Sequence, residues 1–284
     1  MRCSVFVAFA LYEDTIMDLP IVLDDVLAIA HSAGDILRDH AAKPRDIHFK
    51  GRIDLVTATD IAIEAFLRER LTALLPESSF LGEEGSPNSA LQGYTWVVDP
   101  VDGTTNFAHG LPYVAISIAL CRDGEVLCGI VNAPLINECF TAIRGKGALR
   151  NGTPMRVSSA GILEHALVAT GFPYSMEREL PGLLARLGRV LSASRGVRRY
   201  GSAAIDLAYV AAGHYDGFYE RRLNPWDVAA GWLLVTEAGG SVTRTNGKPF
   251  LLSAHDILAT NGRIHEELRA CMYEKGEDPD ADPA

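Results

Sequence analysis

Apolar side chains near the start of the chain recur at the spacing of helices. Between residues 21 and 41 they are three or four positions apart and so share one helical face: Val22, Val26, Ile29, Ala33 and Leu37. A second stripe follows a short β-like run, at Ile63, Phe66, Leu67, Leu71 and Leu74. Thr57, with Asp60 three positions later, predicts a capping box at the start of this second helix, and Pro76 predicts its end. We therefore predict two amphipathic helices here.

The pattern then changes to short strands. Three apolar runs, YVAISIAL, EVLCGIVNA and ECFTAIRG, follow the stretch around residue 100, with turn signals at Asp123-Gly124 and Asn151-Gly152. Because the connections are short, we predict an antiparallel meander with the two earlier helices covering one face.

Beyond residue 160 strand-like and helix-like segments alternate. ALVATGF, DGFYE, SVTR and ILAT read as strands, and helices are predicted at 181–192, after VRRYGSAA, in PWDVAAGWLLVTEAGG up to Gly239-Gly240, and near the end. We predict an N-terminal α+β lobe over 19–157 and a C-terminal α/β lobe over 158–273. Residues 1–18 form an extension without predicted structure, and the acidic, proline-bearing tail 274–284 is expected to be disordered.

Composition narrows the function. The net charge of -10 argues against direct nucleic-acid binding, which needs a basic face. The five cysteines are scattered and odd in number, which indicates reduced thiols in a cytoplasmic protein. The start faintly resembles a signal peptide, but its apolar run is about half the usual length and Met17 offers an alternative start, so we expect a cytoplasmic location. No segment approaches the roughly 20 apolar residues of a membrane span.

The stretch WVVDPVDGTTN places two acids at a strand end. Pro100 cannot donate a hydrogen bond to a neighbouring strand, so the strand is predicted to stop there, with Asp99 and Asp102 at its edge. Gly103 permits a sharp turn, and Thr104 begins a helix whose free N–H groups suit a phosphate. Two close carboxylates repel unless a cation lies between them, and hard oxygen ligands of this kind favour Mg²⁺ or Mn²⁺.

Two further motifs offer candidate ligands. Glu83 and Glu84 in FLGEEG lie at the end of another apolar run and could add one ligand, and Asp227 in PWDVAAG, at the head of a late helix, could add another. Each acid taken alone is more typical of a turn, a helix cap or a solvated pair. Four acidic elements, each at the end of an apolar segment, favour a shared metal site instead.

At this point the motifs carry a family resemblance. GEEG, WVVDPVDGTTNFAHGLP and PWDVAAGWLLVTEAGG, in this order, resemble the three-part motif of the inositol monophosphatase family of Mg²⁺-dependent, lithium-sensitive phosphatases. DLVTATD, NGTPMRVS, TGFPYS and GSAAIDLAYVAAG match as well, so the resemblance runs from about residue 20 to 272. It implies the layered αβαβα sandwich of the inositol monophosphatase and fructose-1,6-bisphosphatase type, and a homodimer.

The resemblance also implies residue roles. The first metal would be held by Glu83, Asp99 and the Val101 carbonyl, the second by Asp99, Asp102 and Asp227, and a third, weaker one would share Glu83. Two or three Mg²⁺ ions are thus implied, with Mn²⁺ as a substitute. Thr104, with Asp60 behind it, and Glu83 would orient the attacking water. The phosphate and substrate contacts would be the Gly103 and Thr104 amides, the wall Gly201, Ser202 and Ala203, and Glu220 on a sugar hydroxyl.

The implied reaction is hydrolysis of a phosphate monoester by a metal-activated water, with a phosphorylated polyol or sugar as substrate and myo-inositol 1-phosphate as the main expectation. Histidinol phosphate, fructose 1,6-bisphosphate and 3′-phosphoadenosine nucleotides are substrates of relatives and stay open. The length and compact second lobe favour the monophosphatase branch over the nucleotide branch, whereas the acids match histidinol phosphatase equally well. Glu220 also has a plain alternative, a strand-end acid paired with Arg221 or Arg222. A different class of function also stays open: a protein-binding regulatory role in transcription or ribosome assembly.

Overall fold

The computed structural model describes residues 19–43, 47–49, 55–85, 91–173 and 180–273. The helices are α2 Leu19–Ala41, α3 Ala58–Leu74, α4 Thr104–His109, α5 Leu180–Ala193, α6 Ala203–Ala211, α7 Pro225–Glu237 and α8 His265–Cys271. The strands are β1 Ile47–Phe49, β2 Leu55–Thr57, β3 Ser79–Gly82, β4 Tyr94–Asp102, β5 Ala115–Arg122, β6 Glu125–Ala133, β7 Glu138–Ile143, β8 Gly147–Arg150, β9 Thr153–Pro154, β10 Leu167–Thr170, β11 Gly196–Arg198, β12 Gly217–Arg221, β13 Ser241–Thr243 and β14 Asp256–Thr260. The extension 1–18 and the tail 274–284, with the predictions made for them, lie outside the described residues.

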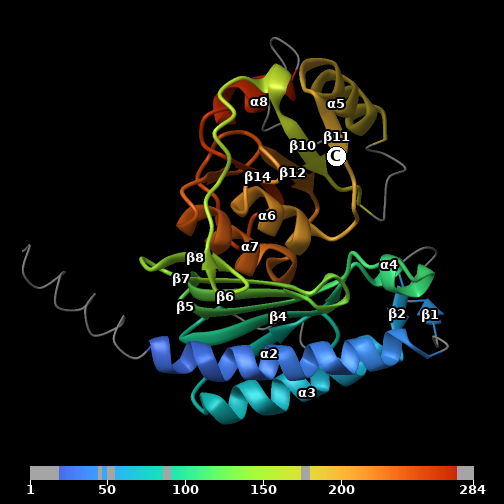
Figure 1. Cartoon of the computed structure of the whole chain (residues 1–284), viewed down its shortest axis with the longest axis vertical. Helices are drawn as coiled ribbons and strands as arrows, with labels where there is room; N and C mark the ends of the chain where they lie inside the picture. The colour runs from blue at the N-terminus through green and yellow to red at the C-terminus, as the bar shows by residue number, and fades with distance from the viewer. Residues whose placement is uncertain (1–18, 44–46, 50–54, 86–90, 174–179, 274–284) are drawn as a thin grey trace, which may run out of the picture.

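These elements stack in five layers (Figure 1). Helices α2 and α3 cover the outer face of a seven-stranded sheet, and α6 and α7 lie between that sheet and a second, five-stranded one. Helices α5 and α8 cover the far side of the second sheet. The expected αβαβα sandwich is therefore confirmed.

The first two helices form for the local reasons that the sequence indicates. Thr57 caps α3, and its Oγ1 accepts a hydrogen bond from the Thr59 N–H at 3.2 Å. The Asp60 carboxylate in return accepts the Thr57 N–H at 3.0 Å, which completes the capping box. Of the α2 and α3 stripes, Val26, Leu37, Leu67 and Leu71 are fully buried in the cluster against the first sheet. Ile29, Phe66 and Leu74 pack against the same cluster and are partly buried.

The first sheet has the strand order β3-β4-β5-β6-β7-β8-β9. Strands β5 to β7 form the predicted antiparallel meander, which the structure extends to β4 on one side and to β8 and β9 on the other. Positive φ angles at Asp123 and Gly124 and at Asn151 and Gly152 confirm both tight turns. At the edge, β3 instead pairs parallel with β4. The sheet is thus not purely antiparallel, because residues 83–93 carry the chain from the end of β3 back to the start of β4.

Strand β4 does not end at Pro100, contrary to the prediction. It continues to Asp102, and its pairing with β5 shifts register between Asp99 and Asp102. The shift in register explains how the strand continues past Pro100. A bulge leaves one residue outside the ladder, and a proline, which has no N–H, is tolerated there. The bulge lies at the aspartates themselves.

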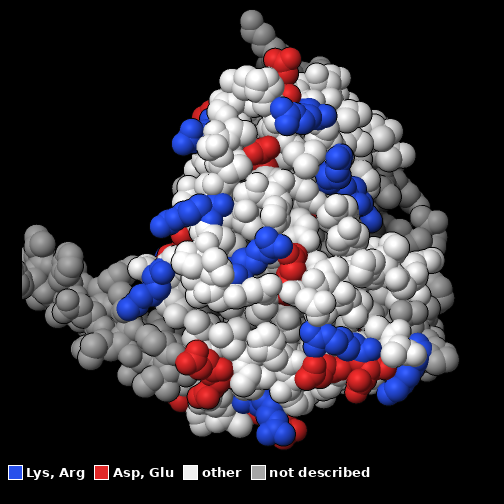
Figure 2. Space-filling view, in the orientation of Figure 1, with Lys and Arg blue, Asp and Glu red and all other residues white. Residues whose placement is uncertain are grey.

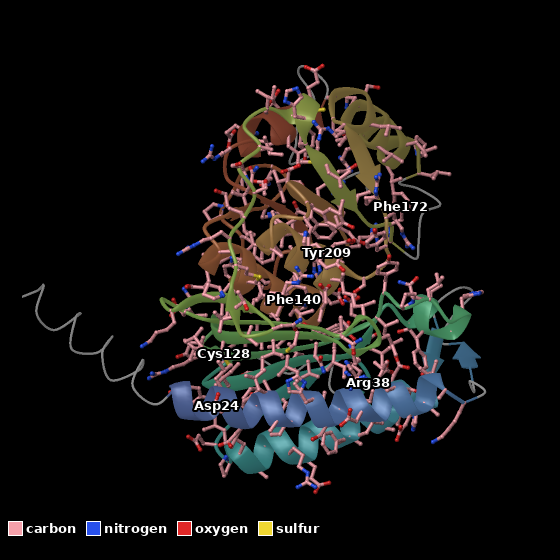
Figure 3. The ribbon with its side chains drawn as sticks, in the orientation of Figure 1. Asp24, Arg38, Cys128, Phe140, Phe172 and Tyr209 are labelled. Atoms are coloured by element: carbon pink, nitrogen blue, oxygen red, sulfur yellow. The ribbon has the colours of Figure 1, made fainter. Side chains whose placement is uncertain are left out.

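The second sheet has the order β11-β10-β12-β14-β13, with parallel pairs on one side of β12 and antiparallel pairs on the other. One hydrophobic cluster joins the two sheets through α6 and α7. In it, the Phe140 and Tyr209 rings meet edge to face with centroids 6.1 Å apart (Figure 3). Because this core is shared, the division into lobes at 157 and 158 stays a prediction. In the described part of the chain, no helix is long and apolar enough to cross a membrane.

Candidate active site

Two of the predicted acids lie at the bulged end of β4. Asp99 and Asp102 keep only 2% and 8% of their surface exposed. One oxygen of Asp99 accepts the Val101 N–H at 3.0 Å, so the carboxylate itself shapes the bulge. The plain alternative of a solvated turn is excluded for both aspartates, because a turn on the surface would leave their side chains in water.

Asp102 is bound from the other half of the molecule. Its Oδ2 accepts the Ser202 hydroxyl and the Ala204 N–H, each at 2.6 Å. Ser202 is also the N-cap of α6, so the carboxylate lies at the positive end of that helix. Burial raises the pKa of Asp102 to about 6, against the opposing effect of the hydrogen bonds from Ser202, Ala204 and Ala203. The predicted wall of Gly201, Ser202 and Ala203 thus lies directly beside Asp102.

The four predicted acidic ligands come together from three places in the fold, which are the turn after β3, the end of β4 and the start of α7. Burial raises the pKa of Asp99 well above its usual range, and the charges of Glu83, Asp102 and Asp227 raise it further. Burial likewise raises the pKa of Asp227, with Asp102 and Glu83 adding to it. Asp227 also accepts the Asn224 N–H at 2.6 Å, so its alternative role as a helix-capping residue of α7 holds as well.

This acidic cluster fits a hard divalent cation by its chemistry. Its donors are carboxylate oxygens, the ligands of Mg²⁺ and Mn²⁺, and the charges that act most strongly on Asp99 are all negative. Among the described residues, however, no three His, Cys, Asp or Glu side chains already converge as a closed metal cage. The carboxylate oxygens of the cluster therefore suit a cation, whereas a closed cage of ligands is not preformed among the described residues.

Thr104 and Asp60 meet beside the cluster. Thr104, the first residue of α4, donates its hydroxyl to Asp60 at 3.2 Å and to the Val101 carbonyl at 3.0 Å. Burial raises the pKa of Asp60, while hydrogen bonds from Thr57 and Thr104 oppose that rise. Asp60 therefore both completes the capping box of α3 and bonds to Thr104, across 44 positions of sequence.

Gly103 makes the turn between β4 and α4 in the left-handed region, with φ +94°. A Cβ atom there would lie 2.8 Å from the Tyr113 carbonyl oxygen and 3.2 Å from that of Gly201, so only glycine fits. Asn106, one turn into α4, donates its side-chain NH₂ to the carbonyls of Tyr113 and Tyr200, each at 2.7 Å. Sequence reasoning missed this residue, which fastens α4 to the loop before α6.

Glu220, on β12, completes the group of acids. Burial raises its pKa to about 8, the charge of Asp102 adds to this, and the charge of Arg199 opposes it. A Cβ atom on Gly171 would lie 2.0 Å from one Glu220 carboxylate oxygen, so glycine at 171 makes room for this side chain. Nearby Asp206, on α6, is buried, and its Oδ1 has no hydrogen-bond partner among the described residues. Gly171 and Asp206 fall within the motifs TGFPYS and GSAAIDLAYVAAG, but no role was predicted for either residue, because their neighbours are distant in the chain.

The comparison with known proteins agrees with this geometry. The model of the Inositol monophosphatase family matches residues 22–277. The inositol-1-monophosphatase of Rhizobium meliloti is 42% identical over 86% of this chain and 92% of its own length. The Nus factor SuhB of Escherichia coli is 39% identical over 89% and 96%. The crystal structure of the extragenic suppressor protein suhB from Bartonella henselae superposes with a TM-score of 0.84 at 37% identity, covering 89% of this chain and 99% of that one. The chain therefore belongs to the inositol monophosphatase family, phosphatases that hydrolyse phosphate monoesters.

Proposed function

We propose that the protein is a Mg²⁺-dependent phosphatase that releases phosphate from a phosphorylated polyol, most favourably a myo-inositol monophosphate. The observation that carries the proposal is the acidic cluster of Glu83, Asp99, Asp102 and Asp227 beside the start of α4, in which Asp99 and Asp102 are buried and Glu83 and Asp227 are partly buried. Burying this much like charge is unfavourable unless a cation compensates it, so the cluster is best explained by metal-assisted chemistry.

The residues proposed to hold the cations are Glu83, Asp99 and the Val101 carbonyl for one ion, and Asp99, Asp102 and Asp227 for a second. A third, weaker ion would share Glu83, and Mn²⁺ is expected to substitute. When bound, such ions neutralise the phosphate oxygens and make a coordinated water more acidic.

The protein's own groups would orient the reactants. Asp60 and the Val101 carbonyl accept the hydroxyl hydrogen of Thr104, so the lone pairs of the Thr104 oxygen are left to accept a hydrogen bond from the attacking water. Glu83 is proposed to hold the same water. The Gly103 and Thr104 amides are proposed to receive the phosphate, since the left-handed turn at Gly103 directs the chain into α4 there.

Substrate choice is proposed to rest on Glu220. A carboxylate can accept hydrogen bonds from two neighbouring hydroxyls, which suits a polyol. Its position near Asp102, with Arg199 as the opposing charge, supports a place at the substrate side of the metal cluster. The alternative, in which Glu220 forms a strand-end ion pair with Arg221 or Arg222, explains the position of Glu220 less well. The basic charge that acts on the pKa of Glu220 is that of Arg199.

The deciding experiment is a Mg²⁺-dependent phosphate-release panel over myo-inositol 1-phosphate, histidinol phosphate, fructose 1,6-bisphosphate and 3′-phosphoadenosine 5′-phosphate. We expect the highest kcat/KM with the inositol ester. The esters are compared by kcat/KM, because discrimination between substrates is a ratio of these values. A higher value for another ester would reassign the substrate within the family. Millimolar Li⁺ should inhibit, and complete insensitivity would contradict the proposed lithium-sensitive site.

A second candidate is a regulatory role through protein binding. It is favoured by the 39% identity to a protein named Nus factor SuhB. Direct nucleic-acid binding is not proposed, because the net charge is -10 and Figure 2 shows acidic and basic residues interspersed on the visible face, without a continuous basic patch. Affinity capture with purified transcription and ribosome-assembly factors, with and without Mg²⁺, separates the two. If the inactive Asp102→Asn variant captures a factor as strongly as the wild type does, the regulatory role is supported. If neither protein captures a factor, only the enzymatic role stays proposed.

The remaining expectations for assembly and location are proposals too. The family resemblance supports a homodimer, which sedimentation velocity would test by its mass. The scattered, buried cysteines Cys121, Cys128 and Cys139 suit a reducing cytoplasm, because burial raises the pKa of each thiol and leaves it unreactive.

A further inference from the structure

The turn that carries Glu83 is held from behind by a second carboxylate. Glu64, on α3, is buried with 4% of its surface exposed. Its Oε2 accepts the Glu84 N–H at 2.7 Å, and its Oε1 accepts the Gly85 N–H at 2.8 Å. The first of these amides belongs to the peptide group that joins Glu83 to Glu84. One side chain therefore fixes the backbone on the C-terminal side of the proposed ligand.

Glu64 is itself fixed by the next turn of α3. Arg68 donates to Glu64 Oε1 at 2.8 Å, and its guanidinium carbon lies 4.3 Å from the centre of the Phe80 ring on β3. The arginine thus contacts both the carboxylate and the strand that leads into the turn. This arrangement links α3, β3 and the turn in one rigid unit.

The glycines of the turn show how closely the parts fit. A Cβ atom on Gly82 would lie 2.7 Å from Glu64 Oε2, and a Cβ atom on Gly85 would lie 2.8 Å from Glu64 Oε1. Both distances are too short for a side chain to be added without a shift. The carboxylate can reach the two amides only because glycine flanks the acids at both positions.

The same helix also supports the other side of the site. Asp60 lies one turn before Glu64 on α3 and accepts the Thr104 hydroxyl at 3.2 Å. Residues four apart lie on one helical face. The first two turns of α3 therefore reach both the turn with Glu83 and the hydroxyl of Thr104, the two groups proposed to hold the attacking water.

We propose that Glu64 is a positioning residue for Glu83 and thereby sets the affinity of the site for its divalent cation. The inference rests on the proposed function, because it assumes that Glu83 is a metal ligand. A carboxylate held by a fixed backbone binds a cation without first losing conformational freedom, and partners of this kind are typically worth roughly 10- to 100-fold in metal affinity.

The test is a titration of Mg²⁺ into the metal-stripped full chain by calorimetry, with Mn²⁺ followed by its EPR signal as a second probe. Glu64→Gln retains one acceptor oxygen and must lose one of the two amide bonds. We expect it to raise the Mg²⁺ Kd roughly 10- to 100-fold, and the Mn²⁺ Kd in the same direction. Gly85→Ala, which crowds the same carboxylate without removing it, should act in the same direction and decides the matter if Glu64→Gln does not fold.

Two controls separate positioning from general stability and from the proposed function. Glu69→Gln makes the same chemical change at an exposed place on the same helix and should leave the Kd unchanged. In a Glu83→Gln background, Glu64→Gln should add no further loss, because coupled residues are non-additive. The inference is overturned if Glu64→Gln leaves the Mg²⁺ Kd unchanged. It is also overturned if Glu64→Gln raises the Mg²⁺ Kd by the same factor in the Glu83→Gln background as in the wild type. A wild-type chain that binds no Mg²⁺, or a Glu83→Gln variant with wild-type Kd, overturns the proposed metal site instead.

Discussion

Replacing Asp102 with asparagine is expected to stabilise the metal-free protein at pH 8 while abolishing phosphatase activity. The substitution is conservative in shape and hydrogen bonding. Two of the donors to Asp102, the Ser202 hydroxyl and the Ala204 N–H, point to the same oxygen, Oδ2. An amide oxygen in that place accepts both, so the variant removes the charge and keeps the contact between β4 and α6.

The magnitude follows from the pKa of Asp102. Burial raises it from 3.8 to about 6. The folded state thus disfavours the ionised carboxyl, and this cost is absent below pH 3.8, grows with pH and is complete above about pH 6. Two pKa units correspond to about 3 kcal/mol of unfolding free energy, which is about 6 °C in Tm for a chain of this size. At pH 8 Asp102→Asn should regain most of the unfolding free energy that the ionised Asp102 costs the wild type, and at pH 4 it should regain none.

The assay is thermal unfolding in EDTA from pH 4 to 8.5, with phosphate release measured in parallel. The Tm of the wild type should fall relative to Asp102→Asn as the pH rises from 4 to 7, and saturating Mg²⁺ should raise the wild-type Tm far more than that of the variant. Asp39→Asn, an exposed change on α2, is the control and should not move either quantity. A variant Tm equal to or below that of the wild type at pH 8 would refute the buried-charge reasoning, and near wild-type turnover would refute the role of Asp102.

Two further substitutions test the water site and the substrate site. Thr104→Val removes the hydroxyl that bonds to Asp60 at 3.2 Å, and kcat should fall roughly 100-fold with the Mg²⁺ Kd retained; an unchanged kcat would remove Thr104 from the reaction. Gly171→Ala places a Cβ atom 2.0 Å from Glu220 and must displace that carboxylate, so KM for myo-inositol 1-phosphate should rise about tenfold, the equivalent of one lost charged hydrogen bond. KM for p-nitrophenyl phosphate, which has no vicinal hydroxyls, should stay the same, and an equal rise for both esters would show general damage.

The sequence by itself determined the local structure of the site. The capping box of Thr57 and Asp60, the glycine turn at Gly103 and the stripes of the first two helices each depend on residues a few positions apart, so spacing alone predicts them. The order of the acidic motifs indicated the family in the same way. The prediction that the strand ends at Pro100 was wrong, because the bulge that accommodates this proline depends on the pairing with β5.

Only the tertiary structure decided how the pieces support one another. Asp102 is bound by Ala204, which is 102 positions away, and the turn of Glu83 is held by Glu64 on another element. Such contacts depend on which strands pair and which helix faces pack, so no short pattern encodes them. The acids could be found one by one from the chain, whereas the effect of their charges on one another arises only when the turn after β3, the end of β4 and the start of α7 come together in the fold.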